Sequence, residues 1–388
     1  MSPPPSNQLV TAIQGDAREV LRRLPAGIVH CCVTSPPYLG LRDYGLEPVV
    51  WGGGADCCHD WAPVSSRRGA TARRAGSVCR TCGGWLGSLG LEPSMTLYLS
   101  HVVEVFREVW RVMRDDGVVW VNMGDSYCTS AGRQMAGADL LERGDRVSVK
   151  AKDLVGQPWL VALALRNDGW WLRSDVVWSK PNPFPEPNTD RPRRAHEYLF
   201  LLAKSPTYFY DAEAVRGLAP TLSRRRSADA VDGRGPNLRT VWEIPTERHR
   251  DGHFATFPRA LVRPCILSST SERGCCGRCG APWRRVVEVT YEPLGRPASS
   301  DSVGDVRRFH VRTGRVQQRM RKEVRTIGWE PTCRHGGAPV PCTVLDPFAG
   351  TGTTLAVAAE LGRRGIGIEL NPDYHRLMER RWEEERAA

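Results

Sequence analysis

Hydrophobic positions recur along this chain in two patterns, a helical one and a short continuous one. Apolar residues three or four positions apart predict helices over residues 17–24, 98–113, 159–165 and 355–361. Short apolar runs predict buried strands over residues 9–13, 28–33, 118–121, 175–178, 198–203, 343–345 and 366–368. Because helices and strands alternate, the pattern predicts an α/β fold with a doubly wound sheet of five to seven strands.

Two segments interrupt this alternation. Residues 51–93 are rich in Gly, Arg and Cys, and residues 271–342 are basic and again contain Cys. We interpret both as inserts into one domain formed by residues 1–50, 94–270 and 343–388. A chain of 388 residues fits one large α/β domain that carries inserts.

Charge and cysteine usage narrow the functional class. The chain has 54 Lys and Arg against 43 Asp and Glu, a formal charge of +11, which favours a polyanionic partner. The amino terminus lacks the basic and apolar regions of a secretory signal, and no apolar run reaches the ~18 residues of a membrane span. We therefore expect a cytoplasmic protein without membrane contact. Thirteen cysteines, an odd number, argue against a fully paired disulfide framework.

A glycine-containing loop near the carboxyl end has the features of a nucleoside-cofactor site. The predicted strand 343–345 leads into Asp-Pro-Phe-Ala-Gly-Thr-Gly-Thr-Thr at residues 346–354, and a helix follows. Glycines allow close approach to a ligand, and the start of the helix offers free N–H donors. Glu369 ends the next strand, 23 residues after Asp346, near the spacing at which an acid meets a ribose hydroxyl.

The place of this loop in the chain is unusual, because such a βαβ unit normally opens its domain. Here it closes the domain, while Asp16 follows the first predicted strand as if that strand were the third. Joining the two chain ends restores a continuous order. The sequence therefore predicts a circularly permuted domain, which requires neighbouring termini.

Three motifs together resemble the β-class DNA amino-methyltransferases. They are Ser35-Pro36-Pro37-Tyr38, the 346–354 loop, and His-Phe-Ala-Thr-Phe-Pro at residues 253–258. The blocks at residues 122–127, 175–182 and 196–198 agree, so the resemblance spans nearly the whole chain. It implies a Rossmann-like, seven-stranded class I methyltransferase sheet, circularly permuted, that uses S-adenosylmethionine.

The chemistry of Ser35-Pro36-Pro37-Tyr38 follows from the weakness of an exocyclic base amine as a nucleophile. Its lone pair is conjugated into the ring, and acceptors around its N–H groups favour a pyramidal nitrogen with a localised lone pair. Ser35 Oγ and the Pro36 carbonyl are the expected acceptors, held in place by proline stiffness. Tyr38 is expected to stack on the extruded base, since a base inside a duplex cannot reach the methyl donor.

The resemblance also implies the cofactor contacts. Backbone groups of residues 348–352 are expected to hold the methionine part, Glu369 the ribose hydroxyls and Asp16 the adenine amine, although an Asp after a strand often serves only as a helix cap. The complete expected set is Asp16, Thr34, Asp346, Pro347, Phe348, Ala349, Gly350, Gly352, Thr353, Thr354, Glu369, Leu370 and Asn371, with Phe257 and Pro258 closing over the cofactor.

The expected reaction is methyl transfer to the exocyclic amine of a flipped base at a specific DNA site. In this family Ser before Pro-Pro-Tyr accompanies cytosine N4 more often than adenine N6, so we favour cytosine and keep adenine as the alternative. A rival of another class is a catalytically inactive, zinc-containing nucleic-acid-binding protein. An RNA or protein methyltransferase is a weaker rival.

Cysteine and histidine spacing predicts two structural zinc sites. Each insert pairs one Cys-x-x-Cys with one Cys-x-His, in opposite order, and these are groups that can complete a tetrahedral zinc. The predicted ligand sets are Cys57, His59, Cys79 and Cys82 in the first insert, and Cys276, Cys279, Cys333 and His335 in the second. Cys58, Cys275 or Cys342 could replace a ligand, and sets crossed between the inserts are possible. Metal binding should supply much of the folding energy of the inserts.

Basic residues cluster in the inserts and loops, as expected for contacts to DNA phosphates. The clusters lie at residues 67–74, 191–194, 224–226 and 307–325. The interval between the 196–198 and 253–258 blocks is short, so we predict that the two inserts share base recognition, with residues 284–328 essential. We expect double-stranded DNA as substrate, a bacterial or phage gene, and a cognate restriction endonuclease as a possible separate chain.

Overall fold

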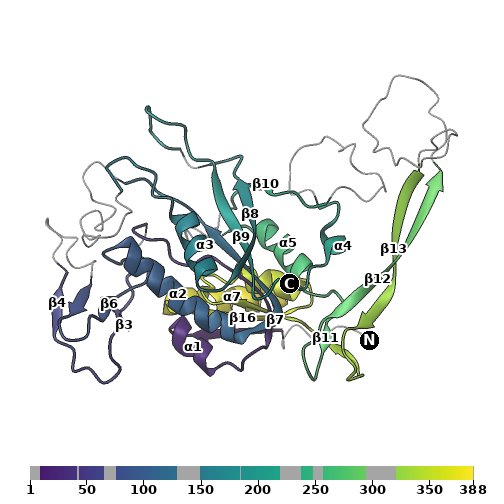
Figure 1. Cartoon of the computed structure of the whole chain (residues 1–388), viewed down its shortest axis with the longest axis horizontal. Helices are drawn as coiled ribbons and strands as arrows, with labels where there is room; N and C mark the ends of the chain where they lie inside the picture. The colour runs from purple at the N-terminus through teal and green to yellow at the C-terminus, as the bar shows by residue number, and fades with distance from the viewer. Residues whose placement is uncertain are drawn as a thin grey trace.

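The computed structural model describes residues 9–41, 43–64, 76–128, 149–183, 185–218, 237–247, 257–293 and 320–387. A large mixed sheet forms its centre (Figure 1). In spatial order its strands are β1 (Val10–Gln14), β16 (Arg364–Glu369), β15 (Thr343–Asp346), β2 (Val29–Thr34), β7 (Met113–Met123), β9 (His196–Ala203), β8 (Trp171–Ser179) and β10 (Val241–Glu243). Neighbours are parallel except around β9, which is antiparallel to both β7 and β8.

This sheet confirms the predicted α/β fold and corrects the predicted strand number from seven to eight. The additional strand, β10, has three residues and pairs with β8 at the edge, where Trp242 anchors it in the core. A segment this short carries no hydrophobic period of its own. The predicted helices and strands all occur, with bounds that differ by a few residues.

Helices cover both faces of the sheet, because the central strands are buried on both sides (Figure 1). One face carries α1 (Ala17–Arg23), α2 (Met95–Val112) and α3 (Gln157–Asn167). The other carries α5 (Arg259–Ser269), α6 (Thr353–Glu360) and α7 (Pro372–Ala387), with the short α4 (Ala212–Val215) beside α5. Alternation in β2 shows the division, since Cys32 joins the first core cluster whereas Cys31 and Val33 join the second.

Each predicted insert forms its own small antiparallel structure outside this sandwich. The first is a four-stranded sheet of β3 (Val49–Trp51), β6 (Trp85–Gly87), β5 (Ser77–Cys79) and β4 (Trp61–Pro63). The second contains the pair β11 (Cys275–Cys276) and β14 (Pro339–Val340) and the long hairpin β12 (Trp283–Pro293) and β13 (Met320–Pro331). The two inserts lie at opposite ends of the molecule, and the hairpin projects away from its body (Figure 1). No helix in the described part of the chain is long and apolar enough to cross a membrane.

Candidate active site

The carboxyl ends of the central strands open into one cavity of about 460 Å³. Its wall takes residues from the segments after β1, β2, β15 and β16, where open α/β sheets bind their ligands. The volume lies in the range of small-molecule sites, about 300 to 1,000 Å³. All four residues of the Ser35–Tyr38 motif line it, together with most of the 346–353 loop.

The loop after β15 is shaped to approach a polar ligand. Gly350 and Gly352 have φ of 53° and 82°, and a Cβ on Gly352 would come within 2.6 Å of Met378 Cγ. Gly352 is the N-cap of α6 and has no side chain to form a capping hydrogen bond. No capping side chain therefore occupies the first N–H groups of the helix. Within the described structure, the buried hydroxyls of Thr351 and Thr353 also have no hydrogen-bond partner. These donors fit a bound cofactor with polar groups at this end of the cavity.

Two buried carboxyls frame this loop. Asp346 accepts hydrogen bonds from the Thr34 and Thr354 hydroxyls, both at 2.7 Å, and from Phe348 N–H at 3.1 Å. Burial nevertheless raises the pKa of Asp346 to about 6. Glu369 accepts from the N–H groups of Gly350 and Asn371, and burial raises the pKa of its carboxyl as well.

Asp16 lies in the cavity wall, but its carboxylate already has partners. It caps α1 by accepting from Arg18 N–H at 2.8 Å, and both of its oxygens accept from the Arg18 guanidinium. The helix-cap alternative therefore describes its contacts in the structure. The contact to an adenine amine stays a prediction.

The predicted catalytic residues line the same cavity, directly after β2. The Ser35 hydroxyl donates to Tyr38 Oη at 3.0 Å, and Tyr38 Oη lies 3.3 Å from Asn122 Oδ1 and from Glu197 Oε2. Burial, followed by the nearby Glu197 carboxylate, raises the pKa of Tyr38 well above its usual range. Tyr38 is thus held by its hydroxyl, and a Cβ on Gly124 would come within 2.9 Å of its ring.

Glu197 and Lys180 are cavity residues that the sequence did not single out. Their side chains form a mostly buried ion pair, and Lys180 Nζ lies 4.3 Å from the centre of the Trp178 ring. Lys180 belongs to the 175–182 block and Glu197 to the 196–198 block. Both blocks support the family resemblance, but the sequence assigned neither residue a role. The available signal was Glu197, a charged residue at the start of β9 directly before an apolar run.

Some expected cofactor residues lie behind the wall instead of in it. Thr34 and Thr354 are buried and orient Asp346, and Gly352 and Pro258 begin α6 and α5. The residues of the expected set that line the cavity are Asp16, Asp346, Pro347, Phe348, Ala349, Gly350, Thr353, Glu369, Leu370, Asn371 and Phe257. Residues 253–256 lie outside the described residues.

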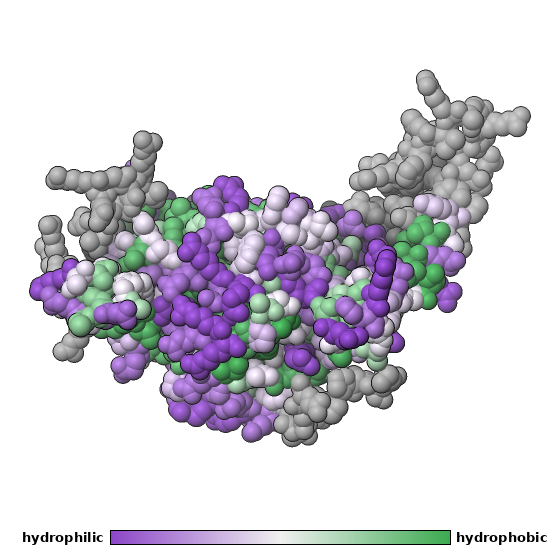
Figure 2. Space-filling model, turned by 60° about the horizontal axis from the view of Figure 1, so that its bottom comes forward, coloured by the Kyte–Doolittle hydropathy of each residue, from purple (hydrophilic) through white to green (hydrophobic). Residues whose placement is uncertain are grey.

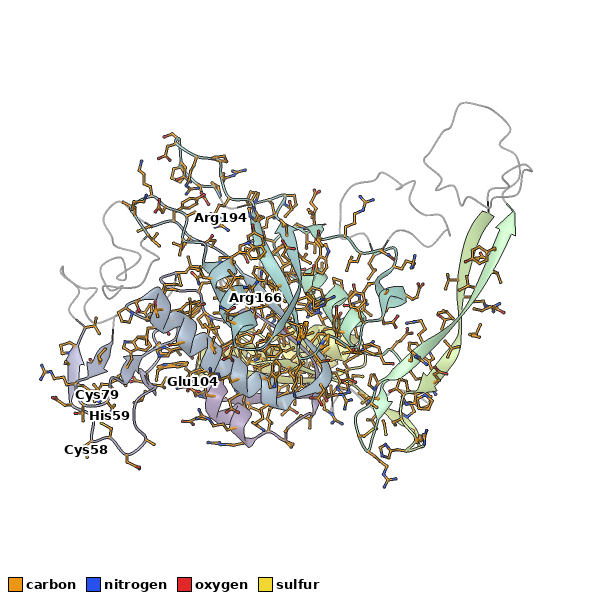
Figure 3. All side chains as sticks on the ribbon, in the orientation of Figure 1. Cys58, His59, Cys79, Glu104, Arg166 and Arg194 are labelled. Atoms are coloured by element: carbon orange, nitrogen blue, oxygen red, sulfur yellow. The ribbon has the colours of Figure 1, made fainter. Side chains whose placement is uncertain are left out.

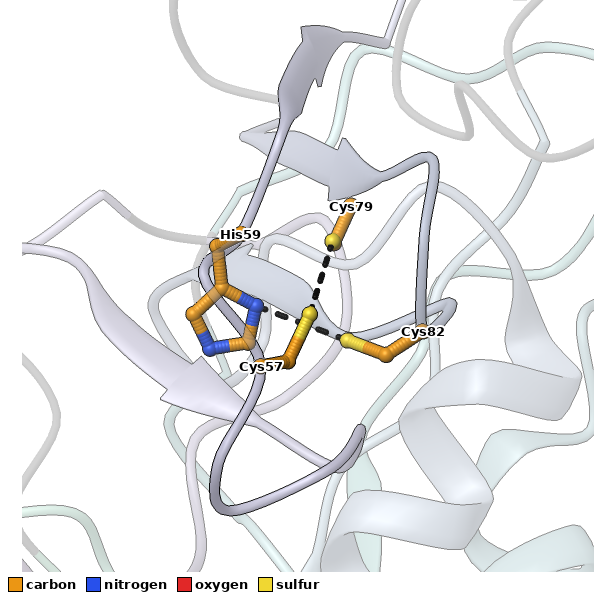
Figure 4. Close-up of side chains that lie close together, drawn as sticks. All are labelled: Cys57, His59, Cys79 and Cys82. Carbon is orange, nitrogen blue, oxygen red and sulfur yellow. Dashed lines mark hydrogen bonds between the residues drawn. The ribbon is translucent and has the colours of Figure 1, made fainter.

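The first predicted ligand set comes together at the tip of the small sheet. The ligand atoms of Cys57, His59, Cys79 and Cys82 lie within 4.8 Å of one another (Figure 4). Cys57 and Cys79 sulfurs are 3.8 Å apart, and Cys82 Sγ is 3.4 Å from His59 Nδ1. A tetrahedral zinc with Zn–S of ~2.3 Å and Zn–N of ~2.0 Å requires about these spacings. Exposed Cys58 is not part of the group.

The second predicted set forms an equivalent group. Cys276, Cys279, Cys333 and His335 also lie within 4.8 Å of one another, with His335 Nδ1 3.2 Å from Cys279 Sγ. Backbone N–H groups of Cys279 and Arg278 lower the pKa of Cys276 to about 6, which favours the thiolate that binds zinc. Neither group takes a ligand from the other insert.

A third group, His30 of β2 with Cys275 and Cys342 of the second insert, is buried where the insert joins the large sheet. His30 Nε2 is hydrogen-bonded to the Gly280 carbonyl and Nδ1 accepts from Thr343 N–H. With both ring nitrogens engaged, His30 has none left for a metal. This group therefore attaches the insert to β2, and Cys275 and Cys342 do not replace ligands of the second set.

Few of the basic clusters fall on described residues. Residues 67–74 and 224–226, and the 307–325 cluster up to residue 319, lie outside them. Arg191 pairs with Glu186 and stacks on Tyr127 at 3.5 Å, and Arg194 lies 3.5 Å from Asp125. Arg193 is exposed.

Curated relatives align with nearly the whole of this chain. The type II methyltransferase M.Cfr9I of Citrobacter freundii is 36% identical over 372 residues, which cover 94% of this chain and 84% of that protein. The type II methyltransferase M.SmaI of Serratia marcescens is 34% identical over 379 residues, or 95% and 89% of the two chains.

Among solved structures, the PvuII DNA methyltransferase, described as cytosine-N4-specific, aligns with 98% of this chain and 90% of its own. The identity is 15% and the TM-score 0.49. A profile of the DNA methylase family matches residues 29–276 and 342–380, breaking only across most of the second insert. The chain therefore belongs to the DNA methylase family, whose members include N4 and N6 amino-methyltransferases.

Proposed function

We propose that this protein transfers a methyl group from S-adenosylmethionine to N4 of a flipped cytosine at a specific site in double-stranded DNA. One observation carries the proposal: the Ser35–Tyr38 motif and the 346–353 loop follow the neighbouring strands β2 and β15 and line the same cavity. A methyl donor on the loop then faces an amine at the motif. Direct transfer between them needs no covalent intermediate with the protein.

Ser35 is arranged to accept from the target amine. Its hydroxyl hydrogen is directed to Tyr38 Oη, which leaves the Oγ lone pairs free to accept from a base N–H. With the Pro36 carbonyl as a second acceptor, the amine lone pair is turned out of conjugation toward the methyl donor. The chain Ser35–Tyr38–Glu197 offers a path for the proton that the amine loses after transfer.

The cofactor end uses the loop and the carboxyls around it. S-Adenosylmethionine supplies an electrophilic methyl on its sulfonium. Residues 348–352 hold its methionine part, Glu369 its ribose hydroxyls and Asp16 its adenine amine, with Phe257 against it. Asp346, kept in place by Thr34 and Thr354, adds negative charge beside the cationic cofactor.

The test is transfer of a labelled methyl group to DNA, followed by analysis of the nucleosides. The expected product is N4-methylcytosine, and N6-methyladenine would select the alternative base. Ser35→Ala should lower the single-turnover rate by about a hundredfold, a magnitude typical of one positioned catalytic group. A wild-type protein without activity on any DNA would instead support the catalytically inactive nucleic-acid-binding protein.

The remaining features complete the proposal. The catalytic domain comprises residues 1–50, 94–270 and 343–388 and is circularly permuted, which is supported by the pairing of β1 with β16. Each insert, 51–93 and 271–342, holds one structural zinc through its four ligands, because no ligand position is left open for water. Two zinc ions per chain are expected by elemental analysis, and a freshly purified reduced protein without zinc refutes this part.

The hairpin of the second insert supports its proposed role in DNA recognition. A two-stranded ribbon fits the major groove, and exposed Arg284 and Arg325 lie on opposite strands of this one. The same ribbon, which forms the arm of the second insert, also carries exposed apolar residues: Val287, Val289, Tyr291 and Ile327. Figure 2 shows hydrophobic surface on this arm. Deleting residues 284–328 should abolish specific binding, and unchanged specificity refutes the assignment.

The cellular setting follows from this activity. We infer a bacterial cytoplasmic enzyme, encoded by a host or phage genome. A restriction endonuclease of the same site specificity, on a separate chain, is the expected partner system. Cleavage of unmethylated but not of methylated host DNA by an extract of the source cells tests this association.

A further inference from the structure

The first insert forms part of the wall of the cofactor cavity. Val49 and Trp51 of β3 line the cavity, and Ser88 and Leu89, directly after β6, line it too. No described residue of 271–293 or 320–342 does so. The two inserts share their metal-ligand chemistry, but among the described residues only the first insert lines the cavity.

A buried aromatic stack fixes this wall to α2. Trp51 and Trp85 are opposite each other in the β3–β6 pair and are 4% and 0% exposed. Both rings stack on His101 of α2, with centroids 4.8 and 5.4 Å away. His101 is in turn bonded to the buried Glu92 at 3.0 Å.

Arg18 connects the same wall to Asp16, which also lines the cavity. Its guanidinium lies 3.6 Å from the centre of the Trp51 ring and donates to the Val50 carbonyl. It also donates to both oxygens of Asp16 and to Glu104 of α2. In the view of Figure 3, Glu104 lies between the labelled His59 and Cys79 of the cluster and the central sheet.

The segment that leaves the insert also supports the catalytic turn. The Gly90 carbonyl accepts from Gly40 N–H at 2.8 Å, and a Cβ on Gly90 would come within 3.2 Å of Pro37. Glu92 accepts from Gly90 N–H at 2.7 Å, which joins this turn to the His101 stack. Residues in or beside the metal-ligand sheet thus contact both the Arg18–Asp16 pair and the turn that follows Ser35–Tyr38.

The strands of this sheet are three residues long and are joined at the cluster. Cys79 ends β5, and Cys82 lies in the turn before Trp85 starts β6. Without a metal, β5 is held against β6 by a short ladder and by the hydrogen bonds of the 79–84 turn, and strands this short are not stable alone. The position of Trp51 against Arg18 then depends on the cluster.

We propose that the first Cys/His cluster is a positioning element for the cofactor, so that affinity for S-adenosylmethionine depends on metal at this cluster and on the Arg18–Trp51 contact. The inference rests on the proposed function, because it presumes that this cofactor occupies the cavity. It assigns the two metal sites different tasks. The second cluster serves the DNA-facing hairpin and leaves the cofactor site unaffected.

The test measures cofactor binding and metal content of the full-length protein, with no methyl transfer required. Cys82→Ser should lose one zinc per chain and bind S-adenosylmethionine about tenfold more weakly in calorimetric titration, the effect of losing about one stacked contact. The matched variant Cys279→Ser should also lose one zinc yet keep the affinity of the wild type. Equal affinity of Cys82→Ser and wild type, or equal weakening by both variants, overturns the inference.

A second pair of variants keeps the metal and changes only the connection. Arg18→Gln should retain two zinc ions and bind the cofactor about fivefold more weakly, whereas Arg22→Gln, an exposed arginine that pairs with the same Glu104, should bind it normally. Normal binding by Arg18→Gln overturns the inference even where Cys82→Ser does not fold. A wild-type protein that holds two zinc ions but binds no S-adenosylmethionine overturns the proposed function, and this inference with it.

Discussion

The two inserts present one ligand chemistry in two structural contexts. The first buries Trp51 and Trp85 against α2 and lines the cavity, whereas the second attaches through polar contacts and carries a hairpin away from the body. His30 and Arg114 bond to the carbonyls of Gly280 and Cys279 at the base of that arm. A Cys/His cluster therefore does not define a function by itself, because the surface against which it packs decides what it positions.

The largest expected effect comes from shortening the β12–β13 hairpin, the arm of the second insert. Replacing residues 289–324 by Asn-Gly joins Glu288 to Arg325, which are opposite in the hairpin, by a tight turn. Specific DNA affinity should fall at least about a thousandfold, the lower range of the difference between specific and non-specific binding. Cofactor affinity should stay within about twofold, since no described residue of the hairpin lines the cavity. Retained DNA specificity, measured by competition binding, would assign base recognition to other residues.

The next effect tests whether the first insert belongs to the core. Glu92→Gln removes the charge of a fully buried carboxylate that holds His101 and the Gly90 turn. Unfolding free energy should fall by about 2 kcal/mol, because a buried charged hydrogen bond is weakened. Urea unfolding measures it, with the exposed Glu19→Gln of the Glu19–Arg23 pair as control. Equal small losses for both variants would mean that the insert is only loosely attached.

Acid titration tests the buried carboxyl of Asp346 in the cavity wall. Asp346 has a folded pKa of about 6, above that of an unfolded Asp, so between these values only the folded state holds the proton. Relative to Asp346→Asn, the cofactor-free wild type should therefore gain about 2 kcal/mol as the pH falls from ~7 to ~4.5. Urea unfolding at each pH gives the difference.

The same titration followed by hydrogen exchange sharpens the comparison. Amides of β3 and β6 should become more protected at lower pH together with the core, while those of β12 and β13 should respond less. The unfolding free energy of the wild type minus that of Asp346→Asn should rise on acidification, and a constant or falling value contradicts the assignment. Equal protection changes in both inserts contradict the structural distinction.

The smallest effect concerns the anchor of the arm. Asp211 accepts from Arg285 at 3.0 and 3.2 Å and also caps α4, and Asn keeps the cap while removing the charge. DNA affinity should fall by about 1 kcal/mol with little change in melting temperature, because Arg285 retains Glu272. Glu213→Gln, in the same helix, is the charge-matched control, and equal DNA affinity in Asp211→Asn and this control would remove Asp211 as an anchor.

Much of the central sheet and both ligand groupings could be predicted from sequence, since each depends on local spacing. The runs over 28–33 and 343–345 become β2 and β15 because strands buried on both faces must be continuously apolar. The Cys-x-x-Cys pairs determine which ligands can share a metal. In the structure, each Cys-x-x-Cys pair lies together with the Cys-x-His pair of the same insert.

Contacts between distant segments were not predictable. Nothing local marks Trp51 as a partner of Arg18 and His101, because tryptophan has no preferred distance in sequence to its neighbours. The place of Glu197 beside Tyr38 depends equally on how the strands assemble. Three-residue β10 carries too little pattern to be counted, which is why seven strands were expected.

The order of strands has a consequence for synthesis of the protein. β16 and β15 lie between β1 and β2, so the first two strands of the large sheet have no hydrogen bonds to each other. During synthesis, the edges of β1 and β2 that pair with β16 and β15 have no strand partner until nearly the whole chain, through Glu369, has left the ribosome. At ~5 to 20 residues per second the final strands arrive many seconds after the first. Such nascent chains should depend on chaperones that shield open strand edges, and early stop codons should yield insoluble fragments instead of a smaller folded domain.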